Sequence, residues 1–165
     1  MSSATLSPTA EIPLLRQHLR KALFISEIKS KRKASVLEEL VAVLATADVT
    51  RHPEGVLDAV LRREALGSTG LGKGIAVPHA RSTLITERSM VIARSTKGID
   101  FDSPDGQPTH LCFLIVAPPL ERDPVYLNLV AEIVRAVRLA KTRQRLLEAP
   151  DFGTVRRTLI EAANG

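Results

Sequence analysis

Residues 61–81 read LRREALGSTGLGKGIAVPHAR. This stretch passes from a helical pattern, through four glycines in eight residues, into a short apolar run that ends at a proline and a histidine. Glycine lets a backbone approach another group closely, and exposed N–H groups beside hydroxyls bind phosphate oxygens. The segment therefore predicts an anion-binding loop, with Ser68, Thr69 and Gly70 as its phosphate-binding residues.

Two nucleotide-binding motifs come close to this stretch, and both fail. Residues 67–74 read G-x-x-x-x-G-K-G, but Gly74 stands where a phosphate-binding P-loop needs Ser or Thr to hold Mg²⁺. That loop also requires a strand before it and a helix after it, whereas here the order is reversed. The dinucleotide fingerprint fails as well, because the glycines open no helix.

His79 is the reactive candidate of the segment. Pro78 favours an extended Val77 and has no N–H, so the chain leaves a short strand and presents the imidazole beside the glycine loop. A neutral histidine is a nucleophile near physiological pH, which suits a transferable phosphoryl group. An inert loop histidine is the alternative that spacing alone leaves open.

Working outward, the patterning predicts one α/β domain. A helix is expected from about Ser35 and another over Pro53–Leu66, with Gly67 as its stop. The last third is expected to be helical, over 126–139 and after a cap at Asp151. Short apolar runs predict the strands: Ile75–Val77, Met90–Arg94 and Leu111–Val116.

Length and composition bound the function. The 165 residues are 44% apolar, enough for one domain, and we expect a flexible lead-in over 1–15 and the domain over 16–165. With no Trp and only one Tyr, stacking on single-stranded nucleic acid is disfavoured. The net charge of +5 is spread among 18 acidic residues, unlike the stripe of a DNA reader. The densest basic run is either solvated or faces an anionic partner: Lys29, Lys31, Arg32 and Lys33.

The remaining signals are weaker. Cys112 is the only cysteine, which excludes an intramolecular disulfide, and no apolar run of ~18 residues predicts a membrane span. We therefore expect a cytoplasmic protein without membrane insertion. His110 and Cys112 alternate on a strand, but a metal site needs further ligands nearby, so core or sheet-end roles are expected for both and no metal is predicted.

The run of Arg63-Glu64, Gly67-Ser68-Thr69-Gly70 and Ile75-Ala76-Val77-Pro78-His79 closely resembles the active-site signature of one family. It is that of the enzyme IIA domains of the bacterial phosphotransferase system, of the fructose/mannitol class and its nitrogen-regulatory relatives. The resemblance implies the mannitol/fructose-type IIA fold, a mixed sheet flanked by helices. It implies that His79 accepts phosphate on Nε2 from HPr or an HPr-like phosphocarrier protein, that Arg63 assists the transfer, and that no cofactor is needed.

The chain departs from the family pattern at one position. Many members carry a second histidine at the start of the helix after the proline-ended strand, where this chain has Tyr126. A tyrosine donates a hydrogen bond but cannot take on imidazolium charge. Lys73 and Arg81 flank the loop and, with Tyr126, are the predicted partner-binding residues, although both cations are also compatible with simple solvation.

Three functions remain open from the sequence. The first is a phosphohistidine carrier in a nitrogen-regulatory type role. The second is a stand-alone enzyme IIA that passes phosphate to a IIB component for sugar uptake. The third is a regulatory binding module without phosphotransfer, against which the intact Arg63 and His79 argue.

Overall fold

The computed structural model describes residues 14–119 and 123–164, without the side chains of residues 123–126. Its centre is a mixed sheet in the order β1-β5-β6-β3-β2. These strands are β1 (Leu23–Ile25), β5 (Ser89–Ile99), β6 (Thr109–Ala117), β3 (Ile75–Ala76) and β2 (Gly70–Gly72). The short strand β4 (His79–Arg81) pairs with β6 farther along the same edge as β3.

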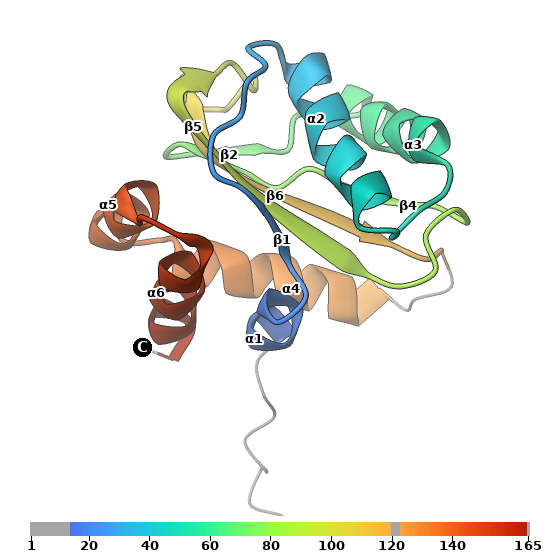
Figure 1. The fold of residues 1–165 in the computed structure, drawn as a ribbon. Helices are drawn as coiled ribbons and strands as arrows, with labels where there is room; N and C mark the ends of the chain where they lie inside the picture. Colours follow the sequence, from blue (N-terminus) through green and yellow to red (C-terminus); the bar gives the residue numbers. More distant parts are fainter. Residues whose placement is uncertain (1–13, 120–122, 165) are drawn as a thin grey trace, which may run out of the picture.

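Helices cover both faces of the sheet (Figure 1). On one face lie α2 (Lys33–Thr46) and α3 (Pro53–Ala65), whose apolar residues pack with Phe101, Cys112 and Leu114. On the other face the helices pack over Phe113 and Ile115. They are α1 (Leu14–Leu19), α4 (Asp123–Ala136), α5 (Ala140–Glu148) and α6 (Phe152–Asn164). The alternating side chains of β6 thus supply both cores.

The strongly patterned elements confirm the sequence predictions, and the weakly patterned ones differ. The helix predicted over 126–139 is α4, which begins at Asp123 and ends at Ala136. The strands β1, β2 and β4 were not predicted, because two or three residues carry no periodicity. Helix α5 was missed because Leu146 is its only buried residue. Helix α1 begins at Leu14 and buries Leu15, so ordered structure starts before residue 16.

The predicted cap and cysteine environments are observed. Asp151 accepts a hydrogen bond at 2.7 Å from the backbone N–H of Thr154 at the start of α6. Cys112 is fully buried, and that burial raises the pKa of its thiol to about 12. His110 donates from Nδ1 to the Ser95 carbonyl at 2.8 Å. Within the described part of the chain, no helix is long and apolar enough to cross a membrane.

Candidate functional site

A break between two short strands places His79. Strand β3 pairs with Leu111 and Cys112 of β6, and β4 resumes the parallel pairing at Ile115. Val77 and Pro78 lie in the break, and the Pro78 carbonyl accepts a hydrogen bond from the Ile115 N–H at 3.0 Å. Pro78 has no N–H to continue the ladder. His79 is therefore held by the sheet at its backbone while its side chain is half-buried at the edge.

Both ring nitrogens of His79 contact named groups. Nδ1 lies 2.8 Å from the Val77 carbonyl, and Nε2 lies 3.2 Å from Nε of Arg63. An arginine N–H can only donate, so Nε2 is the acceptor and carries the lone pair. A carbonyl can only accept, so the proton is on Nδ1. The neutral tautomer with Nε2 as its basic nitrogen satisfies both contacts.

The surroundings favour this neutral form. Burial is the largest cause that lowers the pKa of His79, and the charges of Arg63 and Arg81 lower it further. The hydrogen bond to Val77 and the charge of Glu64 act in the opposite direction, but the net pKa lies below its ordinary value. The imidazole is consequently unprotonated, and nucleophilic, at neutral pH.

Arg63 is positioned by the end of α3, which packs against β4. Its Nη1 donates to the Gly67 carbonyl at 3.0 Å, just past the helix, while Nε reaches His79. A cation in the last turn of a helix also suits the helix dipole. The guanidinium thus bridges the helix end and the imidazole, as the sequence pairing of Arg63 with His79 predicts.

The turn after α3 is held by an internal hydrogen-bond network. The buried carboxylate of Glu64 accepts from the Thr69 N–H at 2.9 Å and from the Thr69 hydroxyl at 2.6 Å. The Ser68 hydroxyl donates to the Phe101 carbonyl and accepts from the Gly70 N–H at 3.0 Å. The hydroxyls predicted to bind phosphate therefore contact protein groups here, and that role of Ser68, Thr69 and Gly70 stays a prediction.

The remaining glycines form the tip of the β2–β3 hairpin. Gly72, Lys73 and Gly74 all have positive φ, and the Lys73 N–H donates to Asp105 at 2.8 Å. Gly74 O accepts from the His110 N–H, and His110 precedes Ile115, the partner of His79, by five residues on β6. At roughly 3.3 Å per residue this separation is about 16 Å. The structure therefore brings Arg81, but not Lys73, to His79.

His79 opens into a cavity of about 470 Å³ whose cationic wall includes Arg62, Arg63 and Arg81. Two exposed leucines form its apolar rim: Leu66, 85% exposed, and Leu127, 62% exposed. Tyr126 precedes Leu127 in α4, but its side chain lies outside the described residues. The site thus combines an imidazole, several guanidinium groups and an apolar edge.

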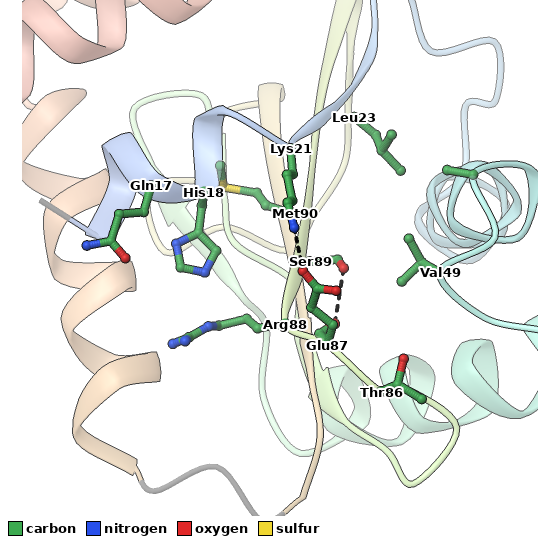
Figure 2. A pocket seen from close by; sticks show the side chains of 11 residues that line it. Gln17, His18, Lys21, Leu23, Val49, Thr86, Glu87, Arg88, Ser89 and Met90 are labelled. Atoms are coloured by element: carbon green, nitrogen blue, oxygen red, sulfur yellow. Dashed lines mark hydrogen bonds and ion pairs between the residues drawn. The ribbon is translucent and has the colours of Figure 1, made fainter. Parts of the chain in front are cut away.

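A second cavity, of about 580 Å³, lies beside the first strand of the sheet (Figure 2). It is lined by residues of α1 and of the beginning of β5, and an exposed ion pair between Lys21 and Glu87, at 3.1 Å, crosses it. None of the predicted site residues lines this cavity. The smaller cavity at His79 is therefore the candidate functional site.

Sequence reasoning missed two residues that shape the site, Glu64 and Lys33. Lys33 Nζ lies 2.7 Å from Glu64 Oε1. Glu64 stands inside the quoted signature, next to Arg63, which was the signal available for it. Lys33 belongs to a basic run that resembles a solvated surface, so nothing local distinguished it.

Comparison with known proteins identifies the family of the chain. The "PTS system fructose-specific EIIABC component" of Bacillus subtilis is 35% identical over 82% of this chain, which spans only 21% of that protein. The "Nitrogen regulatory protein" of Pseudomonas aeruginosa is 28% identical over 92% of this chain and 97% of its own length. The crystal structure of "Nitrogen Regulatory Protein IIA-Ntr" from Neisseria meningitidis superposes with a TM-score of 0.78 at 26% identity, covering 88% of this chain and 99% of that one.

The family model for "Phosphoenolpyruvate-dependent sugar phosphotransferase system, EIIA 2" matches residues 17–162. This match includes the end of α3, the glycine turn, both strands around Pro78 and the His79 cavity. The chain therefore belongs to the EIIA 2 family of the phosphotransferase system, whose members are phosphotransfer carriers.

Proposed function

We propose that this protein carries a phosphoryl group on Nε2 of His79. The observation that supports this most directly is the pair of contacts at the two ring nitrogens, which leaves the lone pair on Nε2 and the proton on Nδ1. In the transfer, the P–N bond of a donor phosphohistidine breaks as the bond from phosphorus to Nε2 forms. The Nδ1 proton stays on the ring throughout, hydrogen-bonded to Val77.

Arg63 stabilises the transferred group. Phosphoryl transfer passes through a loose state with charge on three equatorial oxygens, so alignment and hydrogen-bond donors supply most of the catalysis. The Arg63 Nε–H that now donates to Nε2 shifts to a phosphoryl oxygen once Nε2 is bonded to phosphorus. Arg81 and Arg62, which line the same cavity, add positive charge around the group.

The phosphate-binding role of the glycine turn is narrower in this proposal. The Thr69 hydroxyl is buried and builds the turn through Glu64, whereas Ser68 is exposed. Ser68 can exchange its bond to the Phe101 carbonyl for a phosphoryl oxygen by rotation of its hydroxyl. Ser68 and the nearby N–H of Gly70 are therefore the proposed phosphate ligands, with Thr69 in support.

The phosphate donor in this proposal is an HPr-like phosphocarrier protein. Leu66 and Leu127 offer an exposed apolar rim at the cavity mouth, as an interface that excludes water around two histidines requires. Arg81 and Tyr126 are the proposed partner contacts beside this rim. Lys73, at the hairpin tip, is proposed to contact only a partner that extends beyond the cavity.

The acceptor side has two candidates. Tyr126, in place of the second histidine, favours a regulatory role of the nitrogen-regulatory type, because phosphate that is not passed on remains as a signal. The fructose-specific name of the Bacillus subtilis relative favours sugar uptake through a IIB component.

The carrier proposal is tested by labelling. Wild-type protein incubated with an HPr-like donor, its upstream enzyme and labelled phosphoenolpyruvate is expected to take up one acid-labile phosphate. His79→Ala is expected to take up none, because the nucleophile is gone. Intact-mass analysis and gel autoradiography measure both, and label on folded His79→Ala would refute the proposal.

Arg63→Lys is expected to fold normally but to accept phosphate on the order of tenfold more slowly, about 1.4 kcal/mol in activation free energy. A lysine ammonium cannot hold the Gly67 carbonyl and a phosphoryl oxygen in the fork geometry of a guanidinium. Single-turnover kinetics by rapid quench measure the rate. Arg157→Lys, on the exposed face of α6, is the matched control and should match wild type.

The pKa of His79 predicts the pH dependence of phosphate acceptance. Because burial lowers this pKa, the imidazole is expected to titrate below its ordinary value of 6.5 and to remain mostly neutral at that pH. The nucleophilic fraction should thus fall only at lower pH. Titration by nuclear magnetic resonance, with the signal assigned through His79→Ala, measures the midpoint, and a value above 6.5 would contradict the assignment.

The regulatory candidate predicts slow discharge. Labelled wild type chased with a fructose-type IIB component is expected to keep its phosphate, whereas Tyr126→His is expected to discharge faster because a second imidazole is restored. The fraction of label transferred over time measures both. Rapid and equal discharge by the two proteins would favour sugar uptake instead.

A further inference from the structure

Lys33 and Glu64 form a buried ion pair between two helices that are far apart in sequence. Lys33 is the first residue of α2 and Glu64 lies in the last turn of α3, with side chains only 19% and 6% exposed. A cation at a helix N-terminus and an anion at a C-terminus both oppose the helix dipoles. Neither residue is therefore explained by its own helix, and their 2.7 Å contact offsets both placements.

The same two side chains hold both sides of the turn at residues 66–70. Glu64 binds the N–H and hydroxyl of Thr69. Lys33 also lies 3.4 Å from Asp102 and 5.0 Å from the ring centroid of Phe101, whose carbonyl receives the Ser68 hydroxyl. Removal of the lysine cation would therefore loosen the turn from two directions.

Hydrogen bonds connect this pair to the imidazole. The Thr69 carbonyl accepts from the Val77 N–H at 3.0 Å, and the Val77 carbonyl accepts from His79 Nδ1 at 2.8 Å. Arg63 adjoins Glu64 in the same helical turn and reaches Nε2 from the other side. Both groups that fix the His79 tautomer thus lie within two residues of an atom that the Lys33–Glu64 pair positions.

We propose that Lys33 is a positioning residue for phosphoryl transfer, which holds Glu64 ionised and thereby fixes the turn, Arg63 and the orientation of His79. This inference rests on the proposed function for its kinetic consequence. Its geometric part, the link from Lys33 through Glu64 and Thr69 to His79, does not depend on that function.

The electrostatic consequence has a definite sign. The charged groups that act on His79 are Arg63 and Arg81, which lower its pKa, and Glu64, which raises it. Lys33 neutralises Glu64 at 2.7 Å. Without the lysine, an uncompensated carboxylate favours imidazolium, so the His79 pKa rises and the nucleophilic fraction falls.

The test uses Lys33→Met, which keeps the length of the side chain without its charge. We expect its His79 pKa to rise by about half a unit and its phosphate acceptance to slow by roughly tenfold. Lys33→Arg, which keeps the charge, is expected to keep the wild-type pKa and most of the rate. Lys141→Met, an exposed lysine in the first turn of α5, is the matched control and should change neither.

The double variant Lys33→Met/Glu64→Gln removes both charges and is expected to return the His79 pKa toward wild type while transfer remains slow. It also replaces Lys33→Met if the single variant does not fold. An unchanged pKa and rate in folded Lys33→Met, or a wild-type rate in the double variant, would overturn the proposal. If wild type accepts no phosphate, the proposed function fails, and the pKa comparison still decides the role of Lys33.

Discussion

The hydrogen bond from Nδ1 of His79 to the Val77 carbonyl is the contact on which the site depends. It links the imidazole to the backbone only two residues away, so its geometry follows from the break between β3 and β4. That break requires a residue without an N–H between two short parallel pairings, which Pro78 provides. The tautomer of a side chain is thus determined by how a sheet edge is interrupted, and Arg63 then has only one nitrogen to approach.

The parts of the fold that the sequence predicts are those with repeated burial. In α2, Leu37, Leu40 and Leu44 recur at helical spacing and all are buried. In β6, nearly every residue from Leu111 to Ala117 is buried because helices cover both faces of the sheet. Strands β2 and β4 have no such signal, since their existence depends on pairing with residues that are remote in sequence.

The site shows the same division between local and remote information. Arg63 and His79 were predictable because their spacing belongs to a family signature. The contact of Lys33 with Glu64 joins two helix ends, and no periodicity reports it. The glycines were correctly predicted to form a close-packed turn, but Gly72 and Gly74 serve the hairpin tip, where their positive φ values are needed, and lie away from the imidazole.

Charge explains why this arrangement suits a reversible carrier. Around a neutral His79, the Glu64 anion is already compensated by Lys33, so the positive charge of Arg63 and Arg81 is available to an incoming phosphoryl group. Such a group carries about −2 charge near neutral pH, and its arrival removes the lone pair to which Arg63 now donates. The arginine keeps its bond to Gly67 and exchanges only its second acceptor, from nitrogen to phosphoryl oxygen. The loaded and unloaded states therefore satisfy the same donors with little movement, which keeps the two states close in free energy and lets phosphate leave as readily as it arrives.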